Sequence, residues 1–251
     1  MEKTKKLIFF EGIEDNSAFS FTLDEVGRFV PVKMTVYTLF CGEIYPFVAF
    51  EQELASLNQY AFEVSRILEK RWREAACRLE KYRREDPSLS DLLCTPFELR
   101  MGAEDNLDMW ETIAQDASRQ MTALFYSFLE RALHRTCLLI DRRPGEERPR
   151  YDRSKSKIVQ YFSILFGEEW ETRSLLDSEN LKILEMARKV RNDTMHGAYE
   201  DAENRETRSL PFRLTELIDA VSYFLWAAEK AYSALQKDRE TTASCRRTSD
   251  D

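Results

Sequence analysis

Residues 121–140 read MTALFYSFLERALHRTCLLI, and their apolar side chains recur every three or four positions. Because an α-helix has about 3.6 residues per turn, this spacing gathers them on one side of a helix. The stripe consists of Met121, Phe125, Phe128, Leu129, Ala132, Leu133, Thr136 and Ile140. The sequence therefore predicts a long helix from about residue 105 to residue 140, with one face buried in a protein core.

The same period occurs in other parts of the chain. It predicts long helices over about 51–84, 178–196 and 213–236, and a short one over 154–166. Only 7 Gly and 7 Pro occur among 251 residues, which also favours helices over a turn-rich β protein. Since four long helices must bury their apolar stripes against one another, we expect a mainly α chain folded as an antiparallel bundle.

The two ends of the chain differ from this middle part. Residues 7–10, 19–23 and 29–37 are rich in aromatic and β-branched residues, and they predict two or three short strands. The tail is polar, and we expect it to be disordered. The predicted organisation is a small N-terminal β-rich element (1–48), a helical domain (49–237) and a disordered tail (238–251).

Composition excludes several classes of protein. The cysteines have no C-x-x-C spacing, and with two histidines they give no metal-ligand pattern: Cys41, Cys77, Cys94, Cys137 and Cys245. The chain begins without a signal-peptide core, and no apolar run approaches the roughly 20 residues of a membrane helix. We expect a cytoplasmic protein with reduced thiols, no metal, no cofactor and no membrane contact.

Residues 190–199 read VRNDTMHGAY, and they hold the best clue to function. The guanidinium of Arg191 can bind phosphate through two parallel hydrogen bonds, and the imidazole of His196 can move a proton near neutral pH. Asn192 and His196 lie four positions apart on one helix face, whereas Arg191 and His196 are about 140° apart around the axis. Arg191 and His196 therefore converge only if the helix unwinds at Gly197 or if two subunits bring their copies together.

A purely structural interpretation of the same residues is also open. Arg191 shares a helix side with apolar residues, where a charge is costly without a partner, so it could form a bridge to a buried carboxylate. His196 could cap carbonyls at the negative end of the helix dipole. In that case the chain is a helical scaffold.

This part of the chain resembles the HEPN superfamily of helical-bundle proteins. Arg191-Asn192 followed by His196-Gly197 is similar to the R-N-x-x-x-H-G form of the HEPN motif. Residues 127–135 resemble the helix with Phe and Glu that precedes the motif in many members, and residues 155–162 resemble the short helix between them. The resemblance covers about residues 105–236, implies an antiparallel HEPN-type bundle, and leaves residues 1–48 unexplained.

Many HEPN proteins are metal-independent endoribonucleases that act as toxins or antiviral effectors. For this chain the resemblance implies RNA cleavage by attack of the ribose 2′-OH, with His196 as general acid or base. Arg191 would neutralise charge on the phosphoryl oxygens, and Asn192 would orient the phosphate or the imidazole. A homodimer would supply two histidines to one cleft.

The resemblance also bears on partners and on the alternatives. An antitoxin or regulatory protein is a second candidate partner, but the tyrosine that such antitoxins modify stands two residues after the histidine, whereas here Tyr199 stands three residues after it. A HEPN module that cleaves nothing, and only binds RNA, a nucleotide or a partner protein, is the main alternative.

Residues outside the motif complete the expected site. Glu130 is a candidate to hold Arg191 in place, although it could instead form only a helical contact with His134 four positions on. Because the net charge is −8, RNA binding needs a local positive surface. We expect it in the basic loop, at Arg148, Arg150 and Arg153. The basic end of the first helix is the alternative, with Lys70, Arg71, Arg73, Arg78, Lys81, Arg83 and Arg84.

Overall fold

A computed structural model of the chain provides the structure. It describes residues 21–23, 29–31, 42–84, 96–140, 157–167, 178–196 and 210–247. Within these residues the chain is almost entirely helical, so the prediction of a mainly α protein is confirmed. The helices are α1 (Phe47–Arg84), α2 (Pro96–Ile140), α3 (Lys157–Phe166), α4 (Ser178–His196) and α5 (Leu214–Arg247).

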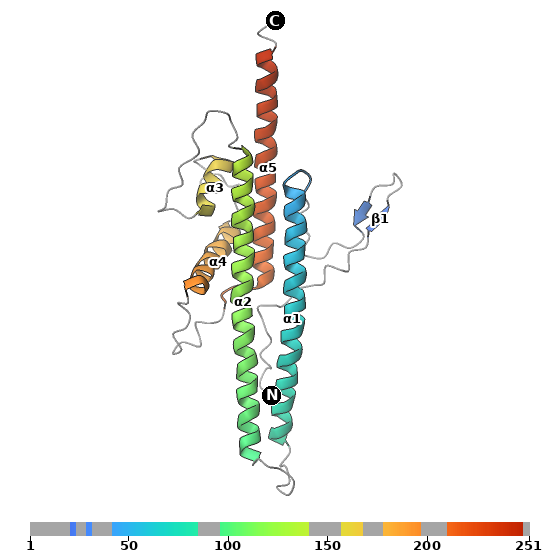
Figure 1. The fold of residues 1–251 in the computed structure, drawn as a ribbon, viewed down its shortest axis with the longest axis vertical. Coiled ribbons are helices and arrows are strands. Elements are labelled where there is room, and N and C mark those ends of the chain that lie inside the picture. Colours follow the sequence, from blue (N-terminus) through green and yellow to red (C-terminus); the bar gives the residue numbers. More distant parts are fainter. Residues whose placement is uncertain are drawn as a thin grey trace.

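Helix α2 is the centre of the bundle. It packs against each of the other four helices, and α4 and α3 also pack against α5. Figure 1 shows that α1, α2, α4 and α5 alternate in direction along the chain, so that α2 and α5 run parallel. The first half of α2 and the last half of α1 extend beyond α5 as a two-helix arm (Figure 1).

The helix ends agree only partly with the predicted ends. Helix α4 spans the predicted residues, from Ser178 to His196. Helix α2 begins at Pro96, earlier than predicted, because proline is tolerated in a first helical turn and because the burial of Ala103 offsets the cost of Gly102 in the helix. Helix α5 continues to Arg247 through the polar residues predicted to be disordered, and no Gly or Pro interrupts them.

Two short strands precede the helices. β1 (Phe21–Leu23) pairs with β2 (Phe29–Pro31) in antiparallel register, with Phe21 opposite Pro31. The first predicted strand, 7–10, lies outside the described residues, as does most of the predicted N-terminal element. A β-rich unit over residues 1–48 therefore stays a prediction. Its last two positions, 47 and 48, belong to helix α1, which begins at Phe47.

The core takes buried side chains from all five described helices, including Phe47 of α1 and Leu184 of α4. The ring of Phe162 on α3 stacks on the ring of Phe224 on α5, with centroids 4.9 Å apart and planes at 22°. Around this pair the largest fully buried side chains of α2 and α5 close the core: Phe125, Phe128, Leu129, Leu133, Leu214, Leu217, Ile218 and Leu225. This aromatic stack fixes the short helix α3 against the bundle.

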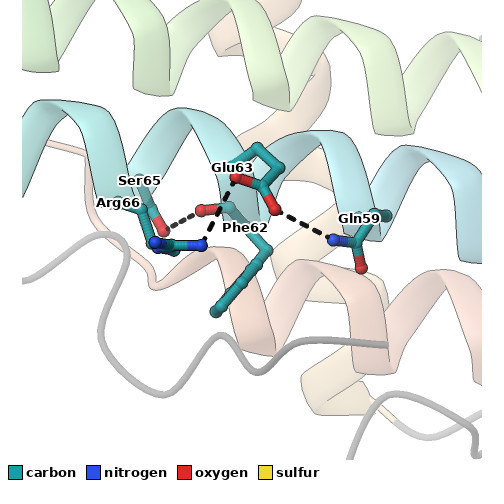
Figure 2. A network of polar contacts seen from close by, with 5 residues as sticks. All are labelled: Gln59, Phe62, Glu63, Ser65 and Arg66. Atoms are coloured by element: carbon teal, nitrogen blue, oxygen red, sulfur yellow. Dashed lines mark hydrogen bonds and ion pairs between the residues drawn. The ribbon is translucent and has the colours of Figure 1, made fainter. Parts of the chain in front are cut away.

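The outer face of α1 is a solvated polar surface. Figure 2 shows Glu63 accepting a hydrogen bond from Gln59 Nε2 at 3.2 Å and pairing with Arg66 at 3.7 Å. Beside them Ser65 Oγ donates to the carbonyl oxygen of Phe62 at 2.7 Å (Figure 2). Exposed contacts of this kind, three or four residues apart on a helix, contribute only about 0.2–0.5 kcal/mol each. This surface therefore carries little of the folding energy.

The turn before α1 is attached to α5 by a buried carboxylate. Glu229 Oε1 accepts hydrogen bonds from the backbone N–H groups of Glu43, at 2.8 Å, and Ile44, at 3.1 Å. At Gly42 a Cβ atom would lie 2.4 Å from the carbonyl carbon of Phe47, so only glycine fits at that position. The hydrogen bonds of Glu229 thus attach the turn before α1 to the last helix, α5.

We predict that Glu229→Ala lowers the free energy of unfolding by about 3 kcal/mol, because two charge-assisted hydrogen bonds are lost and their N–H donors lose their acceptor. Urea titration measures this change. Glu80→Ala is the control, since Glu80 on α1 forms only an exposed ion pair with Arg84 and should cost less than about 1 kcal/mol. Equal losses in the two variants would contradict the assigned role of Glu229.

Candidate functional site

Arg191 lies on α4 with much of its hydrogen-bonding capacity unused. Its Nη1 donates to Asn192 Oδ1 at 3.0 Å, and its Nη2 lies 3.8 Å from Glu130 Oε2, which is too long for a hydrogen bond. Its Nε atom is buried and has no hydrogen-bond partner among the described residues. Because a guanidinium has five N–H donors, and 32% of this side chain is exposed, it can accept an anionic ligand.

Glu130 joins α2 to both α3 and α4. Its carboxylate Oε1 lies 3.1 Å from Nζ of Lys157, the first residue of α3, while Oε2 faces Arg191. Only 15% of the Glu130 side chain is exposed, whereas 67% of Lys157 is exposed. The structure thus brings Glu130 beside Arg191, and it adds Lys157 to the same group.

Sequence reasoning missed Lys157 as a member of this site. No motif spacing relates Lys157 to Glu130 or Arg191, so the sequence does not point to it as a member of this site. The three side chains meet because α3 and α4 both pack against α2. Their proximity is therefore a product of tertiary packing.

Aromatic and charged neighbours surround the group. The ring of His134, one turn beyond Glu130, lies 5.5 Å from the ring of Tyr161 on α3. One turn before Arg191, Arg188 donates two hydrogen bonds to Glu185, at 2.9 and 2.6 Å. These bonds lower the pKa of Glu185 and raise the pKa of Arg188. Arg188 is thus paired with Glu185. Arg191 is therefore the more available of these two arginines of α4 for binding a ligand.

His196 is the last residue of α4, and its side chain lies outside the described part of the chain. The helix is continuous from Arg191 to His196, so the angle of about 140° between their positions applies. Gly197 lies beyond the described residues. Within one copy of α4 the two side chains therefore start on different sides of the helix.

The structure describes only the second of the two predicted RNA-binding surfaces. The first, at Arg148, Arg150 and Arg153, lies outside the described residues. In the second, five basic residues pair with carboxylates: Lys70 and Arg71 with Glu74, Arg73 with Glu69, Arg84 with Glu80, and Arg83 with Glu104. These exposed pairs offset part of the positive charge at the end of α1, so this surface stays an alternative to the basic loop.

The described residues contain no group of three or more His, Cys, Asp or Glu side chains that could hold a metal ion. None of their helices combines the length and the apolar character needed to cross a lipid bilayer. Comparison of the whole chain with protein-family models, curated proteins and solved structures gave no match.

Proposed function

We propose that this protein is a HEPN-type, metal-independent endoribonuclease that acts as a homodimer, in a toxin or antiviral defence setting. The observation that supports this most directly is the state of Arg191. It is a partly exposed guanidinium with unused donors, held between Asn192 and Glu130 at a junction of three helices. A phosphate group is the ligand that such a planar set of donors binds best.

The proposed reaction uses the groups of the motif. An imidazole of His196 takes the proton of a ribose 2′-OH, whose oxygen attacks the adjacent phosphorus. The P–O5′ bond breaks as the second His196, present as the imidazolium, gives its proton to the leaving 5′ oxygen, and the products are a 2′,3′-cyclic phosphate and a 5′-OH. Arg191 stabilises the negative charge that grows on the non-bridging oxygens, while Asn192 orients the guanidinium through the 3.0 Å contact.

Two copies of the chain are part of the proposal. On a continuous α4 helix the positions of Arg191 and His196 differ by about 140°, which favours a cleft in which each chain supplies its residues across a two-fold axis. We predict that the protein is a dimer by mass measurement in solution, and that diluting it to monomer abolishes cleavage. A strictly monomeric protein with full activity would contradict the composite site.

The direct test of the proposal is incubation of purified protein with total RNA in excess chelator. We expect cleavage products that end in 2′,3′-cyclic phosphate and 5′-OH groups, because the reaction uses no metal. Products ending in 3′-OH and 5′-phosphate groups, or cleavage that disappears with the chelator, would overturn this mechanism.

The second candidate function is a HEPN module that binds RNA without cutting it. The separation of about 140° between the positions of Arg191 and His196 on one continuous helix favours it, because Arg191 can then bind a phosphate without His196 beside it. In the same incubation, RNA retained without cleavage supports the binding module, and neither retention nor cleavage supports a scaffold.

A further inference from the structure

Lys157 and Arg191 approach opposite ends of the same carboxylate. Lys157 Nζ lies 3.1 Å from Glu130 Oε1, and Arg191 Nη2 lies 3.8 Å from Glu130 Oε2. The carboxylate is the least exposed of the three groups, at 15%, and both cations reach further into solvent. Glu130 therefore lies behind a pair of cations that face outward from two different helices.

The charges of this group leave an excess of one positive charge. Glu130 offsets only one of the two cations, and Arg188, one turn before Arg191 on α4, is paired with Glu185. The ammonium of Lys157 has three N–H donors, and Glu130 Oε1 can accept from one of them. Both cations therefore have donors with which to bind an anion that presents two oxygens, such as the non-bridging oxygens of a phosphodiester.

We propose that Lys157 is a second phosphate-binding residue, which with Arg191 forms a clamp on the RNA backbone, and that Glu130 positions both cations. This inference rests on the proposed function, since it assigns another residue to the same site. In sequence, Lys157 lies four positions after Arg153, the last of the three arginines that we predict to bind RNA.

The experiment measures binding of a short single-stranded 2′-O-methyl RNA, whose blocked 2′ oxygen prevents cleavage, by fluorescence anisotropy over a range of salt concentrations. We expect Lys157→Gln to weaken binding about ten-fold at low salt, because one charge-assisted contact is lost. The slope of log affinity against log salt should fall by about 0.7 for a lost single-strand phosphate contact. Lys157→Arg should retain most of the affinity, because the charge remains.

Lys182→Gln is the matched control. Lys182 is a lysine on α4 that is 66% exposed and pairs with Glu179 at 2.7 Å, so the same charge is removed from a similar environment. Its affinity and salt slope should stay close to those of the unchanged protein. If Lys157→Gln behaves as Lys182→Gln does, or if the unchanged protein does not bind the probe, Lys157 is not a phosphate-binding residue.

A structural role for Lys157 gives a different result. An exposed ion pair contributes little to folding, so Lys157→Gln should remain folded, and a role limited to the ion pair would change thermal stability without changing binding. If RNA binding depends on Lys157 but the protein cleaves no RNA, the nuclease proposal is wrong and the phosphate-binding role of Lys157 stands. If the protein cleaves RNA but Lys157→Gln binds it as the unchanged protein does, the nuclease proposal stands and the role of Lys157 is wrong.

Discussion

We expect His196→Ala to lower the rate of RNA cleavage by about 10² or more while the helical fold remains. The physical reason is that in the proposed mechanism the imidazole transfers a proton, and general acid–base catalysis of this kind contributes about 10²–10⁴ in rate. His196 is the last residue of α4, so the substitution does not fall in the helix interior. The measurement is the single-turnover rate at saturating RNA, together with circular dichroism of the variant.

Matched variants separate chemistry from structure at this site. Arg191→Lys should also be impaired, because a compact ammonium does not reproduce the two parallel N–H groups of a guanidinium. Lys189→Ala, which removes an exposed cation two positions away, should retain activity. A folded His196→Ala protein with full activity would rule out the catalytic role proposed for the motif.

Phe162→Ala should lower the free energy of unfolding by about 3–5 kcal/mol, the usual cost of removing a buried phenyl ring. Phe162 is buried and stacks on Phe224, and this contact attaches α3 to α5. Since the total stability of a domain is about 5–15 kcal/mol, the loss is a large fraction of it. Urea titration followed by circular dichroism measures the change.

Phe97→Ala is the control for this prediction. Phe97 lies near the start of α2 and is 67% exposed, so the same chemical change there leaves no buried cavity. Its effect should stay within about 0.5 kcal/mol, as for most surface substitutions. Losses of equal size at the two positions would mean that the stack on α3 does not contribute to the core.

Arg148, Arg150 and Arg153 give a prediction that concerns binding alone. Replacing all three with Ala should weaken RNA binding and flatten its salt dependence, while the single-turnover rate at saturating RNA stays nearly unchanged. Anisotropy and single-turnover cleavage measure the two quantities. Unchanged affinity and an unchanged salt slope would remove this loop from the RNA-binding surface.

The periodicity of the sequence was enough to predict most of the helical structure. The apolar stripe of residues 121–140 lies buried in α2, apart from the half-buried Ile140 at its end, and Ser178 begins α4. Prediction was less accurate at helix ends, at Pro96 and Arg247, because several residues there have no strong helical preference of their own. At such positions, neighbouring contacts and the absence of Gly or Pro decide how far a helix continues.

The candidate site divides in the same way. The motif, its place at the end of a helix and the angle between Arg191 and His196 follow from the order of residues, because they depend only on helical geometry. The contacts of Glu130 with Lys157 and Arg191 depend on the packing of three helices, since these side chains meet only when α2, α3 and α4 come together. The spacing of apolar residues determines which face of a helix is buried. Which other helix covers that face depends on how distant parts of the chain bury their apolar surfaces together.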